Sequence, residues 1–375
     1  MKKPIIAILS ISLLLLLAAP VTAAFSYSPT SSGSVFILSN STTGNSVLAY
    51  NRSPDGLLSF AGAYPTGGIG ASGLTGTNQG GVVLSQDGKW LLAVNAGSNS
   101  LSVFRASQHP STSLALTDAV SSDGTYPVSV TIFSEWFGSV VYVLNAGTSA
   151  IAANIAGFYL NSRGVLTPVP GSSQPLSGIT SPAEISFNPT GTVLTVTEKS
   201  TNLIDTYTVN YHGVASGPIF TPSVGGTPFG FAFDNRGQLI VSDASTNELS
   251  SYTVSSSGSV TSIAPSPVSN GGQAAPCWVV VTANGELAFS ANAHIGTISS
   301  YYVSPGGSLT LLQSTAATVG IPDLDMALSA NSHFLYAYDA GTLTIQAFLV
   351  HPDGTLSGIQ TVSGIPAGAD GLAAN

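Results

Sequence analysis

The sequence predicts an all-β protein, a seven-bladed β-propeller with four antiparallel strands in each blade, and three observations support this prediction. Short apolar runs such as WLLAVN, TVLTVTE and ELAFSAN recur seven times, and each ends in an amide or acidic residue. Consecutive ends lie 45 to 55 residues apart, which fits a four-stranded blade. No helical periodicity is present, while 41 Gly and 22 Pro supply frequent turns.

Each repeat contains the strands that a blade requires. A strand such as GGVVLS, PVSVTI or CWVVV precedes every apolar run except the first, and a turn with an alternating run such as SLSVF or TISSYYV follows most of them. The leading strand missing from the first repeat is found at the C-terminus, as ADGLAA over residues 369–374. We therefore expect the C-terminal strand to join the N-terminal blade and close the ring, which removes open sheet edges. Residues 25–375 are expected to form this single domain.

The first 24 residues have the pattern of a signal peptide. Two lysines form a positive start, residues 4–19 are largely apolar, and two alanines at the end offer a cleavage site. A membrane anchor is the alternative, but an apolar run of about 16 residues is shorter than the roughly 20 that span a bilayer. We therefore expect a secreted protein without a stable membrane anchor. The single cysteine, Cys277, excludes an intramolecular disulfide.

The charge of the chain limits its partners. Charged residues make up 7% of the sequence, and the formal net charge is −9. Binding to nucleic acid depends on clustered cations, which this chain lacks, so a nucleic-acid partner is excluded. We expect a monomer.

Several segments resemble a known family. The stretches WLLAVNAGSNSLSVF, PAEISFNPTGTVLTVTEKSTNLIDTYTV and PFGFAFDNRGQLIVSDA are similar to those of the lactonase-type seven-bladed propellers, and the resemblance extends over about residues 34–374. This family includes phosphogluconolactonases and fungal carboxymuconate cyclases. The resemblance implies hydrolysis of a lactone or a lactonising cycloisomerisation. It also implies a functional glutamate at the position of Glu198, where the usual Asn-Glu-Leu reads Thr197-Glu198-Lys199 in this chain.

The residues that end the seven apolar runs are expected to surround one mouth of the central channel. Asn and Asp are common turn formers, which is a sufficient structural explanation for six of them, whereas glutamate has no comparable role in turns. We therefore predict Glu198 as a catalytic group. The predicted contacts to the substrate from this ring are Asn95, Asn145, Asp243, Asn292 and Asp339. The alternative for Glu198 is a surface ion pair with Lys199. The seven residues are Asn40, Asn95, Asn145, Glu198, Asp243, Asn292 and Asp339.

Two departures from the family pattern concern the substrate. The phosphogluconolactonases have Arg-His where this chain has Ser181-Pro182-Ala183-Glu184, and histidines where it has Pro127-Val128-Ser129-Val130. Because arginine is the usual partner of phosphate and carboxylate groups, an anionic substrate loses its anchor. We place several acids near the mouth, with Lys199 as the only fixed cation. Such a negative field repels anions, so a neutral substrate is expected.

Other residues near this mouth offer roles in proton transfer or binding. His294 would act as a general base oriented by Glu198, although loop histidines are more often only solvated. Trp278 offers a stacking platform for a sugar ring, or else packs in the core. Lys199 is a candidate contact to the substrate. No cofactor and no metal-ligand set is predicted, but the oxygen-bearing ring leaves calcium open as an alternative.

Two functions therefore remain open at the sequence level. The first is a secreted lactone hydrolase or lactonising cycloisomerase that acts on a neutral small molecule at the channel mouth. The second is a noncatalytic secreted propeller whose mouth binds a saccharide, a metal or a protein. Fold alone does not distinguish them, because one fold hosts many functions.

Overall fold

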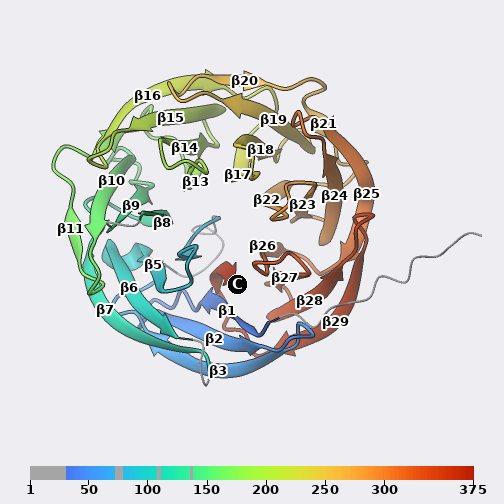
Figure 1. Cartoon of the computed structure of the whole chain (residues 1–375), viewed down its shortest axis with the longest axis horizontal. Helices are drawn as coiled ribbons and strands as arrows, with labels where there is room; N and C mark the ends of the chain where they lie inside the picture. The colour runs from blue at the N-terminus through green and yellow to red at the C-terminus, as the bar shows by residue number, and fades with distance from the viewer. Residues whose placement is uncertain (1–30, 72–78, 108–110, 136–137) are drawn as a thin grey trace, which may run out of the picture.

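The computed structural model describes residues 31–71, 79–107, 111–135 and 138–375, and it contains seven β-sheets arranged as blades around a central channel (Figure 1). Each blade is a sheet with four strand positions, and we number the blades 1 to 7 in chain order from the blade that contains β1. In blades 3 and 5, two short strands share the outermost position. Helical structure among the described residues is limited to one turn, η2 (Ala96–Ser98). The predicted seven-bladed, all-β fold is therefore confirmed.

The strands of each blade occupy four positions, counted outward from the channel. The inner strands are β30 (Asp370–Ala374), β4 (Val82–Leu84), β8 (Pro127–Glu135), β13 (Pro182–Phe187), β17 (Pro228–Phe233), β22 (Pro276–Val281) and β26 (Asp323–Leu328). The second strands are β1 (Gly33–Leu38), β5 (Trp90–Asn95), β9 (Gly138–Asn145), β14 (Val193–Glu198), β18 (Gln238–Asp243), β23 (Leu287–Asn292) and β27 (Phe334–Asp339). The third strands are β2 (Ser46–Arg52), β6 (Ser100–Ser107), β10 (Asn154–Leu160), β15 (Leu203–Val209), β19 (Glu248–Val254), β24 (Thr297–Val303) and β28 (Thr344–Val350). The outer strands are β3 (Leu58–Pro65), β7 (Ser113–Ser121), β11 (Leu166–Pro168) with β12 (Gln174–Pro175), β16 (Ala215–Pro222), β20 (Val260–Ser262) with β21 (Val268–Ser269), β25 (Leu309–Thr318) and β29 (Leu356–Ser363).

The C-terminal strand completes the first blade. β30 pairs antiparallel with β1 over residues 35–38, and the C-terminus lies beside β1 (Figure 1). Next to this pairing, the Ser34 N–H donates to the Asn375 side chain at 2.7 Å, and the Arg52 guanidinium donates to the Asn375 carbonyl at 3.0 Å. The predicted closure of the ring by the C-terminal strand is therefore confirmed.

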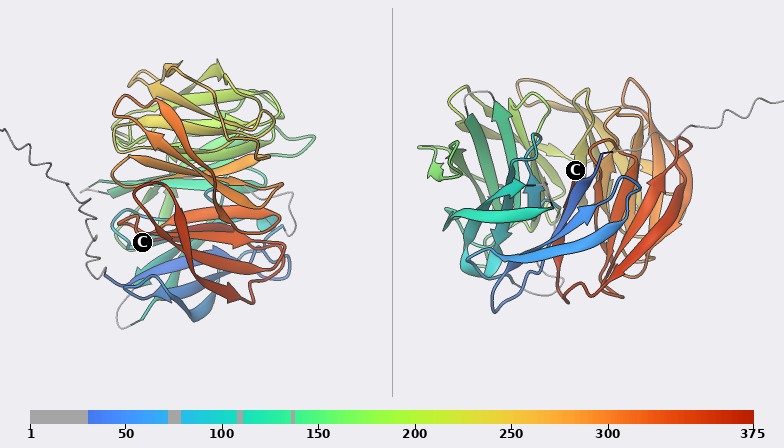
Figure 2. Two further views of the ribbon diagram at one scale, coloured as in Figure 1. Left: turned by 90° about the vertical axis from the view of Figure 1, so that its right-hand side faces the viewer. Right: turned by 60° about the horizontal axis from the view of Figure 1, so that its bottom comes forward.

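The strands run between two faces of the ring (Figure 2). The inner strands begin and the second strands end at one face, which we call the upper face. The hairpins between inner and second strands, and the ends of the third strands, lie at the opposite, lower face. Second strands such as β5 and β23 are buried along their whole length, because each blade is packed between two neighbours. The residues that end these strands are therefore fixed in position by the core.

At the channel wall, backbone N–H groups on the free edges of inner strands bond to side chains of the preceding blade. The Glu184 carboxylate of blade 4 accepts the Phe231 N–H of blade 5 at 2.6 Å. The Asp325 carboxylate of blade 7 accepts the Leu372 N–H of blade 1 at 2.7 Å. Ser129 of blade 3 does the same for blade 4. A buried N–H without a partner costs about 1–3 kcal/mol, so these bonds stabilise the contacts between successive blades.

Blade 5 has Gly230 at the position that Glu184 occupies in blade 4, so its inner strand offers no side chain there to bond the inner strand of blade 6. Gln79, which precedes β4 in blade 2, supplies the missing partner. Its Oε1 accepts the Val279 N–H at 3.0 Å, and its Nε2 donates to the Val279 carbonyl at 2.7 Å. A Cβ on Gly230 would lie 2.2 Å from Gln79 Oε1 and 2.5 Å from the Cys277 carbonyl oxygen. Glycine at position 230 thus makes room for Gln79, which ties blade 2 to blade 6 across the channel.

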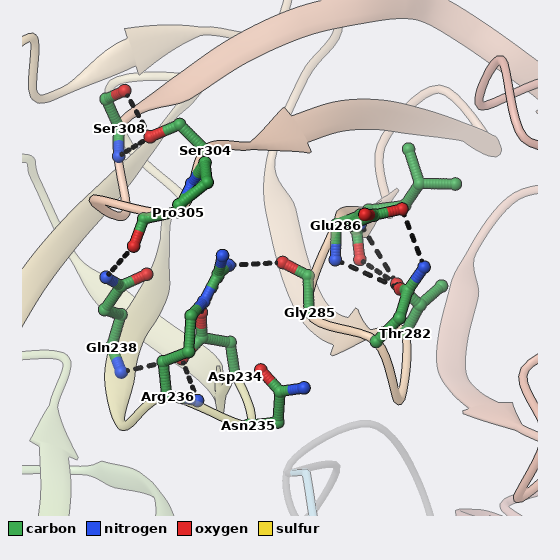
Figure 3. Close-up of polar contacts among 12 residues, drawn as sticks. Asp234, Asn235, Arg236, Gln238, Thr282, Gly285, Glu286, Ser304, Pro305 and Ser308 are labelled. Atoms are coloured by element: carbon green, nitrogen blue, oxygen red, sulfur yellow. Dashed lines mark hydrogen bonds and ion pairs between the residues drawn. The ribbon is translucent and has the colours of Figure 1, made fainter.

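At the lower face, the hairpins of blades 5 and 6 are joined by a polar network around Arg236 (Figure 3). The buried Asp234 carboxylate pairs with the Arg236 guanidinium at 2.7 Å and also accepts the N–H groups of Arg236 and Gln238. The guanidinium donates to the Gly285 carbonyl of blade 6 at 2.5 Å, and the Gln238 amide donates to the Pro305 carbonyl at 3.0 Å. Arg236 is therefore used to hold two blades together.

We predict that Gln79→Ala lowers the free energy of unfolding by about 1–3 kcal/mol, because it leaves the Val279 N–H and carbonyl without their partner. Urea unfolding followed by circular dichroism measures this change. Gln79→Glu keeps the acceptor but loses the donor, and is expected to destabilise as well. The control is Gln238→Ala, whose exposed hydrogen bond is expected to contribute about 0.5 kcal/mol or less. Equal unfolding midpoints for Gln79→Ala and the unchanged protein would contradict the proposed tie.

Candidate functional site

The residues that end the seven second strands, or follow β1 in the case of blade 1, lie at equivalent positions on the upper face, and we call them the junction residues. None is more than 7% exposed. Five of their side chains bond the connection that arrives from the preceding blade, namely Asn95, Asn145, Glu198, Asp243 and Asn292. Asn40 accepts the Ala71 N–H of the connection to blade 2, and Asp339 accepts the Gly341 N–H of the turn that follows it. The side-chain Oδ1 of Asn95 accepts from Asn45 at 3.0 Å and from Thr66 at 2.6 Å, and the Oδ1 of Asn292 accepts from Asn270 at 3.2 Å. These side chains therefore connect one blade to the next.

In four blades a glycine of the incoming connection packs directly against the junction residue. A Cβ added to that glycine would lie only 2.0 to 2.6 Å from the junction side chain. The short Asn and Asp side chains fit this tight contact, which explains why these types recur. Their predicted roles as contacts to a substrate stay predictions, and their burial favours a structural role. The four pairs are Gly68 with Asn95, Gly124 with Asn145, Gly225 with Asp243 and Gly320 with Asp339.

Glu198 occupies the junction between blades 3 and 4 with a longer side chain. It is fully buried, which contradicts the interpretation of Glu198 and Lys199 as a surface ion pair. Its carboxylate accepts the Ser177 N–H at 2.9 Å and the Ser177 hydroxyl at 2.5 Å, and it also accepts the Thr201 hydroxyl. These donors belong to the incoming connection and to the turn that carries Lys199. The catalytic role of Glu198 stays a prediction, and the geometry favours a role in holding this turn.

Asp205 on β15 is a second buried carboxyl beside Glu198. Both of its oxygens are buried without a donor among the described residues. Burial raises the pKa of Asp205 to about 9, and the neighbouring Glu198 carboxylate adds to the effect. Two buried carboxylates side by side are unfavourable, so Asp205 keeps its proton at neutral pH. In blades 2, 5 and 6, the third-strand residue that bonds the junction residue is a serine. A carboxyl at this third-strand position in blade 4 is therefore the sequence signal for the pair of Asp205 and Glu198.

Lys199 follows Glu198 and turns toward the channel mouth. Its Nζ lies 4.4 Å from the centroid of the Phe229 ring, and Phe229 packs against Trp278 with centroids 5.4 Å apart. Burial lowers the pKa of Lys199 to about 8, while Cys277 and Asp370 act in the opposite direction. Lys199, a predicted contact to the substrate, is therefore a largely desolvated amine beside acidic groups.

Two further carboxyls line the channel below this mouth. Glu184 is 6% exposed and Asp325 is 1% exposed. Burial raises the pKa of both groups well above the usual range, the charge of Asp325 adds to the effect on Glu184, and the charge of Asp370 adds to that on Asp325. Glu184 also lines a cavity of about 430 Å³ that continues toward the lower face. The sequence contains a signal for these two channel carboxyls. Each stands at an inner-strand position where other blades have Gly, Ser or Trp.

Two other predicted residues lie elsewhere on this face. Trp278 is 1% exposed and belongs to the core, and its indole nitrogen has no partner in the described part of the chain. This favours the alternative of core packing. His294 is exposed in the turn after β23 of blade 6, two blades from Glu198 in the order around the ring. The structure does not bring His294 and Glu198 to the same blade junction.

Some predictions fall outside the described residues, including the signal peptide over residues 1–24 and the start of the domain before residue 31. Where side chains are described, no group of three or more His, Cys, Asp or Glu residues is arranged to hold a metal ion. No helix in the described ranges has the length and apolar character to cross a membrane.

Comparisons with known proteins agree with this architecture. Residues 44–153 match the family model described as lactonase, 7-bladed β-propeller, so the resemblance to this family is confirmed for that segment. No curated protein matches the chain.

Solved structures of similar shape cover nearly the whole chain. A periplasmic gluconolactonase of Pseudomonas aeruginosa has a TM-score of 0.69 at 16% identity, covering 90% of this chain and 98% of its own. A candidate 6-phosphogluconolactonase of Bacteroides fragilis has a TM-score of 0.68 at 16% identity, covering 93% and 99%. A protein of Lactobacillus plantarum has a TM-score of 0.70 at 15% identity, covering 92% and 99%. At these identities the likeness establishes the fold alone.

We predict that Asp205→Asn stabilises the protein above about pH 5. The folded protein holds a proton on Asp205 up to about pH 9, whereas the unfolded chain releases it near pH 4. Stability therefore falls as pH rises through this window. An amide at position 205 is neutral without binding a proton and removes the second carboxyl beside Glu198, so we expect a gain on the order of 1–3 kcal/mol at pH 8.

Thermal and urea unfolding between pH 4 and pH 9 measure this effect. The control Asp123→Asn removes the same charge from an exposed turn and is expected to leave the pH dependence unchanged. An Asp205→Asn protein that keeps the full pH dependence would show that Asp205 is not the protonated group.

Proposed function

We propose that this protein is a lactone hydrolase that opens a neutral lactone at the upper mouth of the channel. The observation that carries the proposal is the Lys199 amine, held over Phe229 at the mouth with Asp370 nearby. The family match and the likeness to a gluconolactonase support this class of reaction. The proposal includes export by the N-terminal leader, a monomeric protein and a reaction without a cofactor.

Charge at the channel supports a neutral substrate. Glu184, Asp325 and Asp370 are buried in or beside the channel wall, and Lys199 is the cation that the mouth brings close to them. If Lys199 binds the lactone carbonyl, this arrangement of described residues offers no second cation for the negative group of an anionic lactone. Burial disfavours the charged forms of Glu184 and Asp325, so Asp370 is the carboxylate that contributes negative charge beside Lys199. This carboxylate disfavours an anionic lactone, and it also disfavours the new carboxylate of the hydroxy acid that hydrolysis produces.

In the proposed mechanism, Lys199 and Asp370 act on the lactone and on water. The Asp370 carboxylate accepts a proton from water while the water oxygen forms a bond to the lactone carbonyl carbon. The Lys199 ammonium stabilises the oxyanion that develops, which is an effective use of a charge in a desolvated site. The bond between the acyl carbon and the ring oxygen then breaks. The proton held by Asp370 passes to the leaving alkoxide.

Glu198 acts as a positioning residue in this mechanism. Its carboxylate holds Ser177 of the incoming connection and Thr201 of the turn that follows Lys199. On this turn, the backbone N–H of Lys199 donates to the Ser181 carbonyl at 3.3 Å. We propose that these bonds fix the direction in which the Lys199 side chain leaves β14.

We predict that Lys199→Met lowers kcat/KM for a neutral lactone at least 100-fold, because it keeps the packing on Phe229 but removes the charge. Hydrolysis is followed by pH-stat with a panel of neutral, phosphorylated and carboxylated lactones. The unchanged protein is expected to lose activity above about pH 8, as Lys199 loses its proton. The control Lys89→Met removes a lysine from the lower face and is expected to keep full activity.

Glu198→Gln separates positioning from direct catalysis in the same assay. The amide still accepts from Ser177, so we expect a loss of less than tenfold and a shifted alkaline pKa in the pH profile. Complete loss of turnover in a folded Glu198→Gln protein would instead support Glu198 as the catalytic group. Turnover restricted to anionic lactones would contradict the charge argument. If no lactone is hydrolysed, the noncatalytic alternative of a propeller that binds a saccharide, a metal or a protein is favoured.

A further inference from the structure

A second hollow lies on the lower face, at the opposite ends of the strands from the junction residues. It has a volume of about 780 Å³ and extends across blades 2, 3 and 4. Its walls come from the hairpins between inner and second strands and from the ends of the third strands β6, β10 and β15. This volume is within the range of about 300–1,000 Å³ that is usual for ligand sites. We call this hollow the lower groove.

Aromatic side chains form much of the lower groove. Trp90, Phe133, Tyr159, Phe187 and Tyr211 all line it. Tyr211 is 86% exposed, an unusual state for a large aromatic side chain. An exposed ring of this kind offers a flat surface to a ligand rather than a contribution to the core.

The turn that carries Tyr211 is held by several hydrogen bonds. The Asn210 side chain accepts the N–H groups of His212 and Val214 at 2.9 and 3.1 Å. The Tyr159 hydroxyl donates to the His212 carbonyl at 2.5 Å, and the Tyr211 ring lies 3.8 Å from the His212 ring. The backbone of the turn that carries Tyr211 is therefore held by these bonds without a ligand, which reduces the entropy lost on binding.

The charge of the lower groove is opposite to that of the whole protein. The chain has 17 acidic and 8 basic residues, yet Lys89 and Arg105 both line this groove, and Asp87 is the acidic residue among its described lining. Asp87 is paired with Lys89 at 2.9 Å. Arg105 lies opposite Trp90 in the β5–β6 pairing, with its guanidinium carbon 5.8 Å from the ring centroid. The guanidinium is thus placed beside an aromatic surface and has donors available for a carboxylate.

We infer that the lower groove binds an acidic oligosaccharide of two or three uronic acid rings. The apolar faces of sugar rings pack on the exposed rings of Tyr159 and Tyr211, and a ring carboxylate bonds the Arg105 guanidinium. The amide side chains of Asn161 and Asn210 lie along the same groove, where sugar hydroxyls need hydrogen-bond partners. The lower groove shares no lining residue with the proposed lactone site at the upper mouth, so this inference does not depend on the proposed function.

Isothermal titration of the mature protein with trigalacturonic acid tests the inference, with maltotriose as the neutral comparison. We expect binding of the acidic trimer at least tenfold tighter than that of the neutral trimer, and weaker binding at high salt. Arg105→Gln and Tyr211→Ala are each expected to weaken binding at least tenfold. Tyr211 is exposed, so its substitution tests the site without disturbing the fold.

Two control variants define what would overturn the inference. Arg163→Gln removes an exposed cation next to the groove but outside its lining, and binding is expected to stay within twofold. Lys199→Met alters the upper mouth and is expected to leave binding unchanged. The inference is overturned if the acidic trimer does not bind at millimolar concentration, if the neutral trimer binds equally well, or if Arg163→Gln weakens binding as much as Arg105→Gln.

Discussion

The structure depends on the hydrogen-bonding needs of the seven inner strands. Each inner strand pairs with a second strand on one side only, and its other edge faces the channel. A propeller cannot add another strand there, so side chains must bond the N–H groups that remain. Glu184 and Asp325 do this for the blades that follow them, and Gln79 does it from across the channel where Gly230 leaves no side chain. These contacts place carboxyl groups inside the channel as a consequence of building it.

The same principle operates at the upper face, where each connection between blades needs a polar partner. Asn and Asp serve this need where a glycine comes close, as at Gly225 beside Asp243. Glu198 serves it through a longer side chain that reaches Ser177. Its neighbour Asp205 then has to keep a proton, because the two carboxyls are buried together. The geometry of this one junction thus explains part of why a glutamate, Glu198, stands where the other blades have Asn or Asp.

The two faces of the ring differ in charge and in surface chemistry. At the upper mouth, Lys199 is one amine among buried carboxyls, an arrangement suited to polarising a neutral carbonyl. On the lower face, Arg105 lies beside the largely buried Trp90 ring in a wide groove that Tyr159 and Tyr211 also line. We propose two ligands of different charge for the two faces, a neutral lactone at the upper mouth and an acidic oligosaccharide in the lower groove.

The sequence by itself determined the number of blades, the strands in each blade and the closure by residues 369–374. It could do so because strand alternation and turn residues are local patterns that repeat at a fixed interval. Only the tertiary structure decided which polar side chains face the channel and which lie between blades, since that depends on how neighbouring blades pack. Glu198 and Lys199 are adjacent in sequence, yet one is buried in a junction and the other reaches the mouth. The lower groove is likewise assembled from three blades, and no local pattern encodes it.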